Sequence, residues 1–362
     1  MNEMENDIRE RLSELSKLGY TLIKEKKFDE AEKKFNEILK TDDENNYALV
    51  GLGDIERKRG NYDRAIRFYQ RCLGFHIGNK YALIGLADCY RALRQYRKAI
   101  GIWEKYLSQG ETDITVLTRV ADAFRKIKEF DRSKEIYLKV LAIDEDNPYA
   151  LTGLGYLHFD KKDYRSALKY WERMYQHDPA NIKVLTSLGN CHRKLKTFDQ
   201  GLKYFKQALE IEPANFYALF GMADCYRGLN EQQKSMHYWK KILEHDPNNK
   251  VILTRTGDAY RNLKDFDTAE EYYRRALNIE FDTYAVLGLA LINKERGNYL
   301  KAVESLSGLL VNDPKNTRLY LEIADCYLKL DLKDKAKEIL VQYIRTGYKN
   351  STITARLEEL NR

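Results

Sequence analysis

Small and large apolar residues recur along this chain at one fixed interval, the step from Gly19 to Gly53. The first series of small residues is Gly19, Gly53, Ala87, Ala121, Gly155, Gly189, Ala223 and Gly257; Ala290 then follows one position early, and Ala324 again at the full interval. A second small residue stands twelve positions later, from Ala31 to Ala336, and a large apolar residue follows four positions after it, from Phe35 to Leu340. This repetition indicates ten stacked copies of one structural unit rather than a domain with one central core.

Each copy has the pattern of two helices joined by a short turn. An Asn or Asp opens the first helix, since its side-chain oxygen can accept the free N–H groups of the first turn. These predicted caps are Asn45, Asn79, Asp113, Asn147, Asn181, Asn215, Asn249, Asp282 and Asn316. The first helix is expected to end near an aromatic residue, such as Phe28 or Tyr62, and the next residue, Asp29 or Asp63, is a candidate cap for the second helix. The second helix is predicted to end at prolines, which lack an N–H, and no stretch has the pattern of a β-strand.

Two copies show the motif most fully. One contains Leu86, Ala87, Tyr90, Ala99 and Trp103, and another contains Leu188, Gly189, Gly201, Phe205, Ala208 and Pro213. This spacing resembles the tetratricopeptide repeat, with Gly201 in place of the usual alanine, and the resemblance covers roughly residues 12–349. It is interrupted locally, because Gln232 and Lys333 replace the turn aromatic and His158 and His192 replace the first-helix tyrosine.

The resemblance implies an all-α fold, a right-handed superhelical solenoid of antiparallel helix pairs. Its concave groove, lined mainly by first helices, holds an extended peptide or a helix of a partner in this family. We expect a polar N-terminal extension at residues 1–11, a continuous array of about ten repeats at 12–349, and a C-terminal capping helix at 350–362. In that last helix Ser351 is the predicted cap, and Ile353, Leu357 and Leu360 form one apolar face.

Composition favours a cytoplasmic scaffold. The 362 residues contain 62 basic and 55 acidic side chains, giving a net charge of +7. The N-terminus is polar and no apolar run approaches the ~20 residues of a membrane helix, so we expect neither a signal peptide nor membrane insertion. The five cysteines occupy small apolar positions without a C-x-x-C pair, which predicts buried, reduced thiols.

No pattern in the sequence indicates catalysis. There is no H-E-x-x-H, phosphate-binding glycine loop or nucleophile elbow, so we predict no catalytic residue and no cofactor. His158 and His192, with Cys191 beside one of them, raise the question of a metal site. Substitution for a packed aromatic residue is the simpler explanation, and we predict no metal.

Three rows of residues are predicted to line the groove. Counted from each cap, the ninth residue forms an acidic row, Asp54, Asp88, Asp122, Asn190, Asp224, Asp258 and Asp325. The twelfth forms a basic row, Arg57, Arg91, Arg125, Arg193, Arg227 and Arg261. The second forms a tyrosine row, Tyr47, Tyr81, Tyr149, Tyr217 and Tyr284. A spacing of three puts acidic and basic residues on one helix face.

A longer period, two repeats in length, overlies these rows. Tyr-Ala-Leu-x-Gly at 81–85, 149–153 and 217–221 alternates with Leu-Thr-Arg or Leu-Thr-Ser at 117–119, 185–187 and 253–255. Arg119 and Arg255 therefore join the predicted groove. Because Leu291 and Lys294 interrupt the acidic and basic rows, we expect a break in the groove chemistry there, with the main ligand track in repeats two to eight.

The rows have two interpretations. In one, Asp side chains accept hydrogen bonds from the backbone of an extended chain, Arg side chains donate to its oxygens, and tyrosines supply flat contact area. In the other, Asp and Arg pair with each other, at ~0–1 kcal/mol for each exposed pair.

The predicted function is a non-enzymatic scaffold or adaptor for a partner protein or peptide, whose identity the sequence does not give; the oligomeric state is also open. The alternative is single-stranded RNA binding by the Arg, Lys and Tyr side chains. Against RNA, the acidic and basic rows nearly cancel, whereas a phosphate track needs uncompensated positive charge. The acidic tail of a heat-shock chaperone is not supported as ligand, because the fifth helix positions lack the required Lys.

Overall fold

The computed structural model describes residues 3–110 and 112–361, and helices are the regular secondary structure of this part of the chain. Within these residues the helices are α1 (Glu3–Lys24), α2 (Phe28–Thr41), α3 (Asn46–Lys58), α4 (Tyr62–Phe75), α5 (Lys80–Ala92), α6 (Tyr96–Leu107), α7 (Ile114–Lys126), α8 (Phe130–Ile143), α9 (Pro148–Asp160), α10 (Tyr164–His177), α11 (Ile182–Lys194), α12 (Phe198–Ile211), α13 (Phe216–Gly228), α14 (Gln232–His245), α15 (Lys250–Asn262), α16 (Phe266–Ile279), α17 (Thr283–Glu295), α18 (Tyr299–Asn312), α19 (Thr317–Lys329), α20 (Lys333–Arg345) and α21 (Ser351–Asn361).

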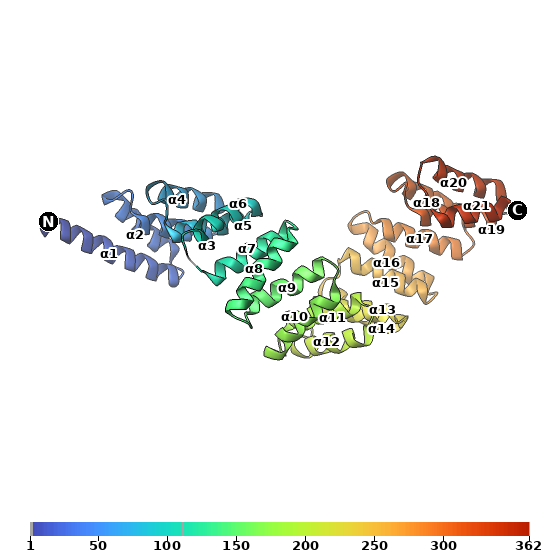
Figure 1. Ribbon diagram of the computed structural model, residues 1–362. Coiled ribbons are helices and arrows are strands. Elements are labelled where there is room, and N and C mark those ends of the chain that lie inside the picture. Colours follow the sequence, from blue (N-terminus) through green and yellow to red (C-terminus); the bar gives the residue numbers. More distant parts are fainter. Residues whose placement is uncertain (1–2, 111, 362) are drawn as a thin grey trace. The chain divides into compact units, whose positions relative to one another are not determined.

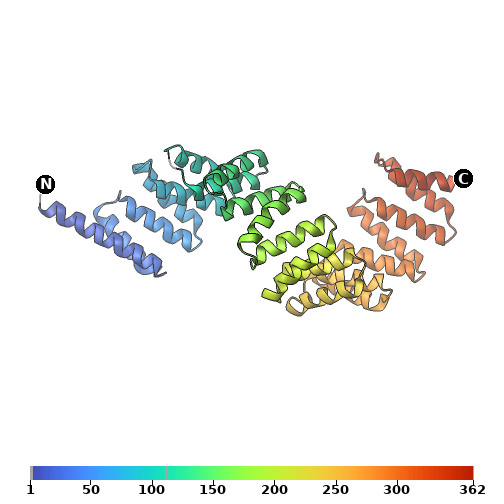
Figure 2. The same cartoon turned by 60° about the horizontal axis from the view of Figure 1, so that its bottom comes forward.

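The helices form pairs within two compact units, Met1–Met174 and Tyr175–Arg362. Odd-numbered helices are the first members of the pairs and even-numbered helices are the second. Within the first unit, for example, α3 packs on α4 and α4 packs on α5, and within the second unit α11 packs on α12 and α12 on α13 (Figures 1 and 2). The predicted all-α array of helix pairs is confirmed. No described helix combines the length and apolar character needed to cross a membrane.

The caps of the first helices are largely those predicted. The Asn45 side chain accepts a hydrogen bond from the Ala48 N–H at 3.1 Å. Equivalent bonds are made by Asn79, Asp113, Asn147, Asn181, Asn215, Asn249 and Asp282. Asn316 precedes α19 but makes no such bond.

The start of the second helices corrects the sequence analysis. Phe28 and Tyr62 are the first residues of α2 and α4 rather than the last residues of the preceding helices. Asp29 and Asp63 therefore lie in the first turn, where their charge favours the N-terminus of the helix, and they do not cap it. The cap position belongs to the residue before the aromatic, because a left-handed residue ahead of it has already turned the chain.

That left-handed residue recurs in every pair. Its φ lies between 58° and 82° at Lys26, Gly60, Arg94, Lys128, Lys162, Lys196, Asn230, Lys264, Gly297 and Asp331. At Lys128 the N–H bonds to the Arg125 carbonyl at 3.0 Å, and the next N–H bonds to Phe124 at 2.9 Å, which closes the end of α7. The position is hard to recognise in the sequence, since only Gly60 and Gly297 carry the residue typical of this conformation.

Large buried side chains from the second helices separate successive first helices. Tyr69 lies against both Gly53 and Gly85, where an added Cβ would approach its ring to 2.6 Å and 2.4 Å. Tyr or Phe occupies this place wherever the next first helix offers a glycine, as at Tyr69, Tyr137, Phe205 and Tyr273. Trp103, Trp171 and Trp239 occupy it where the equivalent residue is Arg119, Ser187 or Arg255.

This alternation explains the two-repeat period of the sequence. Direct packing between first helices occurs at the glycine steps, α3 with α5 and α7 with α9 in the first unit, and α11 with α13 and α15 with α17 in the second. Contacts of similar extent are not found in the described residues at the tryptophan steps α5 to α7 and α13 to α15. At these steps the larger tryptophan ring replaces the close contact with a glycine, and it keeps the two first helices further apart.

Helix α21 follows the tenth pair, and its cap differs from the prediction. The Asn350 side chain, not that of Ser351, accepts bonds from the N–H groups of Thr352 and Ile353, at 3.0 and 3.2 Å. Ile353 and Leu360 are buried against α19 and α20, with Leu357 packed beside them, which confirms the predicted apolar face. At the other end, α1 begins at Glu3, within the predicted polar extension.

The five cysteines are free and buried. Burial raises the pKa of the Cys72 thiol to about 11, and the pKa values of Cys89, Cys191 and Cys225 to about 12. The pKa of Cys326 is also raised by burial. These thiols pack as small apolar side chains, as the sequence predicted.

Candidate functional site

The first helices form the wall on which the predicted site residues lie. First helices pack directly on one another at the glycine steps within each unit, and contacts of similar extent between successive second helices are not found among the described residues. The five members of the tyrosine row lie at the N-terminal ends of α3, α5, α9, α13 and α17, with 59–73% of their surface exposed. Exposure of five large rings in equivalent positions leaves them open to a ligand.

The acidic and basic rows pair with each other within single helices. Arg57 lies 3.1 Å from Asp54, Arg125 lies 2.7 Å from Asp122, and Arg227 lies 2.7 Å from Asp224. The corresponding distances are longer for Arg91 and Asp88, 3.6 Å, and for Arg261 and Asp258, 4.0 Å. In α11 the Arg193 guanidinium donates to the Asn190 side chain at 3.1–3.2 Å.

A second set of pairs links neighbouring first helices. Arg119 donates to Asp88 at 2.8 Å and Arg193 donates to Asp224, each pair being 31 residues apart. Arg255 lies 3.7 Å from Asp224, which therefore faces three guanidiniums. Because Asp88 and Asp224 are only 8% and 7% exposed, their carboxylates are enclosed by arginines rather than open to a peptide.

The charges around Asp224 dominate its protonation. Burial alone raises the pKa of this carboxyl, but the hydrogen bond from Arg227 and the positive charges of Arg227, Arg193 and Arg255 outweigh burial. The pKa of Asp224 therefore lies below its ordinary value, and the group is ionised at neutral pH.

The ion pairs resume beyond the break predicted at Leu291 and Lys294. Lys294 lies 2.6 Å from Glu322 and 3.4 Å from Asp325, and Asp325 also accepts from Arg356 of α21 at 3.1 Å. Lys294 and Arg356 each stand 31 residues from Asp325, the spacing of the pairs around Asp224. Helix α21 thus occupies the place that the first helix of an eleventh repeat would take.

Tyrosines from the second helices donate hydrogen bonds to carboxylates of the acidic row. The hydroxyls of Tyr69 and Tyr273 donate to Asp54 and Asp258, each at 2.7 Å. Burial, followed by the neighbouring carboxylate, raises the pKa of both tyrosines, so they stay protonated donors. This contact was not predicted from the sequence. A signal for it was present, because the repeat that carries Asn190 instead of an aspartate also carries Phe205 instead of the tyrosine.

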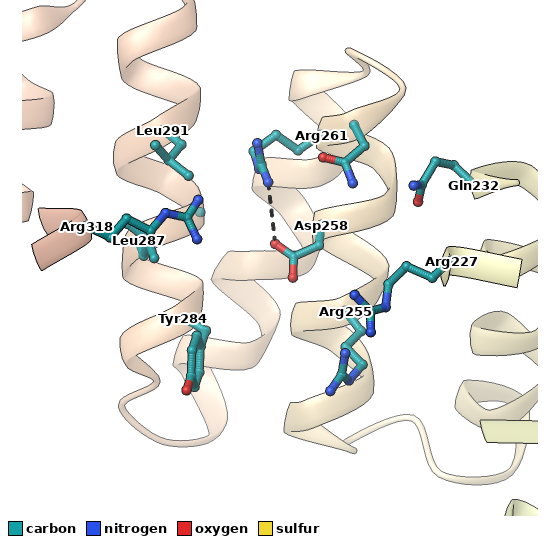
Figure 3. Close-up of a pocket in the computed structure, with 11 residues that line it drawn as sticks. Arg227, Gln232, Arg255, Asp258, Arg261, Tyr284, Leu287, Leu291 and Arg318 are labelled. Atoms are coloured by element: carbon teal, nitrogen blue, oxygen red, sulfur yellow. Dashed lines mark ion pairs between the residues drawn. The ribbon is translucent and has the colours of Figure 1, made fainter. Parts of the chain in front are cut away.

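Two of the cavities on the first-helix wall, one in each unit, contain members of both the acidic and the basic rows. The tyrosine pocket, of 460 Å³, is lined by Arg91, Thr115, Thr118, Arg119, Asp122, Arg125, Tyr137, Tyr149, Thr152, Gly153 and Tyr156. The arginine pocket, of 340 Å³, is lined by Arg227, Gln232, Arg255, Asp258, Arg261, Asn262, Tyr284, Leu287, Gly288, Leu291 and Arg318 (Figure 3).

The two pockets are the same site at two places in the repeat series. Arg227, Arg255, Asp258 and Arg261 stand four repeats after Arg91, Arg119, Asp122 and Arg125, respectively, all with the same offset. Both pockets lie at a glycine step, beside Gly153 and Gly288, with a tyrosine of the exposed row at the rim. In both pockets the wall is hollowed beside the glycine on which a tyrosine from the preceding second helix packs.

Comparison with known families decides the classification. Models of the tetratricopeptide repeat match residues 16–80, 82–115, 114–147, 182–215, 217–249, 252–283 and 294–353. The chain belongs to the tetratricopeptide repeat family. Among characterised proteins, a search by sequence gives no match.

A solved structure shows the same type of fold, and two others align less closely. The C-terminal part of a tetratricopeptide repeat-containing protein from Cytophaga hutchinsonii is 18% identical and has a TM-score of 0.54, covering 66% of this chain and 99% of that one. Yeast Tom70 is 15% identical with a TM-score of 0.43, covering 98% and 96%, and MamA is 24% identical with a TM-score of 0.42, covering 46% and 92%. At 18% identity the likeness to the Cytophaga protein concerns the fold alone.

His158 and His192 of this tetratricopeptide repeat array pack against tyrosine rings. His158 stacks on Tyr170 and His192 on Tyr204, with ring centroids 5.5 and 5.6 Å apart. Tyr226 on Tyr238 and Tyr260 on Tyr272 are the equivalent stacks in later repeats. Substitution for a packed aromatic thus explains His158 and His192. Among the described residues no group of three or more His, Cys, Asp or Glu side chains is placed to hold a metal ion.

Proposed function

We propose that this protein is a non-enzymatic scaffold or adaptor that binds an extended segment of a partner polypeptide along its first helices. The observation that carries the proposal is the exposed tyrosine row next to the glycine-step pockets. Tyrosine combines a large apolar ring with a hydroxyl and loses little conformational entropy on binding, which makes it an effective contact residue. Five buried, free thiols support a cytoplasmic location as part of the same proposal.

In this proposal fewer residues of the acidic row contact the ligand than the sequence suggested. Asp88 and Asp224 are enclosed by guanidiniums, so they set the position of arginines rather than contact a ligand themselves. The contacts to a bound peptide come from the tyrosines and from the exposed guanidinium edges of the basic row. Tyr81, Tyr149, Tyr217 and Tyr284 are the residues on which we expect binding to depend most.

The pairing of arginines with carboxylates of the acidic row also favours a polypeptide over RNA as the ligand. Arg119, Arg125 and Arg227 are hydrogen-bonded to carboxylates of the acidic row. A neutralised guanidinium releases few counterions on binding phosphate, so a strong, sequence-independent affinity for RNA is not expected from these residues.

A tyrosine variant tests the proposal. We expect simultaneous Tyr81→Ala, Tyr149→Ala, Tyr217→Ala and Tyr284→Ala substitution to reduce recovery of the partner set at least tenfold, measured by affinity capture with in-cell crosslinking and quantitative mass spectrometry. The matched control replaces exposed apolar residues of second helices, Leu138, Ile143, Leu300 and Val311, by alanine. Circular dichroism establishes that both variants retain the wild-type helix content.

Two results would contradict the proposal. One is equal recovery of the same proteins by the wild type and the tyrosine variant. The other is release of the captured set by ribonuclease together with tight binding of a uridine oligonucleotide, which would support the RNA alternative instead.

A further inference from the structure

The two equivalent pockets differ in how their arginines are neutralised. In the tyrosine pocket Arg119 donates to Asp88 at 2.8 Å, and Arg125 donates to Asp122 at 2.7 Å and to Asp160 at 2.5 Å. The position of Asp160 is taken by Glu295 in the later repeat, for which no pairing with Arg261 is found within the described residues. Arg119 and Arg125 of the first pocket are thus satisfied by carboxylates of their own unit, whereas its third cation, Arg91, lies 3.6 Å from Asp88.

The arginine pocket has more cations than its carboxylates satisfy. Its lining contains four arginines and one aspartate, Asp258. Arg255 lies 3.7 Å from Asp224, Arg261 lies 4.0 Å from Asp258, and Arg318 lies 3.8 Å from Glu322, all beyond hydrogen-bond distance. The Nε atoms of Arg255 and Arg261 are buried without a hydrogen-bond partner in the part of the chain that the structure describes.

The neighbouring carboxylates are shared among several cations. Asp224 already serves Arg193 and Arg227 at hydrogen-bond distance before Arg255 approaches it. Glu322 lies 2.6 Å from Lys294, which competes with Arg318 for the same side chain. A buried guanidinium nitrogen without a hydrogen-bond partner is costly, and a bound anion would supply the missing acceptor.

The geometry suits a side chain entering between α15 and α17. Figure 3 shows Arg318 reaching in from one side and Arg261 and Asp258 facing it from the other, with Arg227 and Arg255 at the opposite end. Tyr284, Leu287 and Leu291 of α17 provide an apolar wall against which the methylene groups of an acidic side chain can pack. A cavity of 340 Å³ accommodates one side chain with its adjoining backbone rather than a folded element.

We infer that the arginine pocket binds an anionic side chain, carrying a carboxylate or a phosphoryl group, of the partner polypeptide, and that the tyrosine pocket is its charge-balanced counterpart. The inference deepens the proposed function and rests on it. Guanidinium groups bind both kinds of anion through paired, charge-assisted hydrogen bonds. The two pockets therefore impose different requirements on the bound segment, an acidic residue at the second and none at the first.

The test uses fluorescence anisotropy with three labelled peptides of equal length, containing six glutamates, six glutamines, or one phosphoserine among glutamines. We expect the full-length protein to bind the glutamate or the phosphoserine peptide at least tenfold more tightly than the glutamine peptide. Comparison of the two acidic peptides identifies which anion the pocket prefers. A uridine oligonucleotide is measured alongside.

Arg227→Gln combined with Arg318→Gln removes two cations whose side chains are 45% and 58% exposed, so the fold should tolerate the change. The control is Arg71→Gln combined with Arg132→Gln, the same loss of charge at second-helix residues whose side chains are 44% and 58% exposed. We expect the first variant to lose at least tenfold in affinity for the preferred acidic peptide, and the control to lose less than twofold.

The inference is overturned if the glutamine peptide binds as tightly as both acidic ones, if the control loses as much affinity as the pocket variant, or if the oligonucleotide binds more tightly than every peptide. Partner capture separates this inference from the proposed function. If the tyrosine variant loses the partners while Arg227→Gln with Arg318→Gln retains them, the anion pocket is wrong and the scaffold proposal stands. If the tyrosine variant retains the partners, the scaffold proposal itself fails.

Discussion

At the scale of single residues, glycine has two opposite roles in this array. Gly60 and Gly297 hold the left-handed turn between the helices of a pair, at φ values of 82° and 81°. Gly101 and Gly308 lie inside α6 and α18, where an added Cβ would meet nothing within 4 Å. The same substitution by alanine therefore strains the backbone in one case and only restricts the unfolded chain in the other.

We expect Gly60→Ala and Gly297→Ala each to lower stability by about 1 kcal/mol, because a Cβ is unfavourable in the left-handed region. Gly101→Ala and Gly308→Ala should each raise stability by about 0.5–1 kcal/mol, because alanine is the better residue inside a helix. Thermal unfolding followed by circular dichroism gives the four shifts under identical conditions. Stabilisation by all four substitutions would show that a Cβ carries no cost in the turn conformation.

Single residues also mark the limit of sequence-based prediction. The capping Asn and Asp residues were recognised because a short polar side chain before an apolar helix has one common use. The turn position was not, since Lys26, Arg94 and Lys128 give no sign of a positive φ. Helix starts at Phe28 and Tyr62 were misplaced for the same reason, because the turn residue decides where the next helix begins.

At the scale of helices, Asp224 joins three first helices, since it lies on α13 and faces Arg193 of α11 and Arg255 of α15. The ionised form of its carboxylate is more stable in the folded state than in the unfolded chain, because the pKa of Asp224 is lowered on folding. A depressed pKa contributes stability that is present above the ordinary Asp value of about 4 and is lost as the pH falls toward the folded value.

We expect Asp224→Asn to destabilise the second unit by about 3 kcal/mol at pH 7, because it leaves buried guanidiniums without their counter-charge. The variant should also lose part of the stability decrease that the wild type shows below about pH 4. Hydrogen exchange at α11, α13 and α15 between pH 7 and pH 3 measures both effects. Asp313→Asn, an exposed residue in the loop after α18, is the control. If wild type and Asp224→Asn respond to acid identically, the carboxylate does not hold these helices together.

Contacts within one helix were predictable from the sequence, and contacts between helices were not. The acidic and basic rows followed from a spacing of three residues on one helix, and their contacts within a helix, such as Arg125 with Asp122, are those that spacing allows. The links between helices, such as Arg119 with Asp88, depend on the packing distance set by Trp103 and were not deducible from one helix. The pockets likewise required knowledge of which ring lies beside each glycine.

At the scale of the whole molecule, stability is shared between neighbours, because each pair contacts only the pairs beside it. Helix α21 covers the last pair, where Ile353 and Leu360 bury Tyr320, Leu340 and Tyr343. Without it these side chains would face water. The effect should remain local, because nothing distant depends on that contact.

We expect deletion of residues 350–362 to increase hydrogen exchange at least tenfold in α19 and α20 while leaving α3 to α5 unchanged. Hydrogen exchange with mass spectrometry resolves the two regions in one sample. Arg356→Gln, which removes the 3.1 Å contact with Asp325 and the 2.9 Å contact with Glu359, should have a much smaller effect. Uniform loss of protection along the chain would show that the array unfolds as one cooperative body.

The alternation of rings between the first helices constrains how such an array can grow or shrink. Losing one module among repeats three to eight would bring a tryptophan against a position built for a bare glycine, or set a tyrosine against an arginine, at the new junction. Losing two successive modules there would restore the match. Length variation that preserves the fold is therefore expected to proceed by doublets, and an odd change would demand compensating substitutions at the seam.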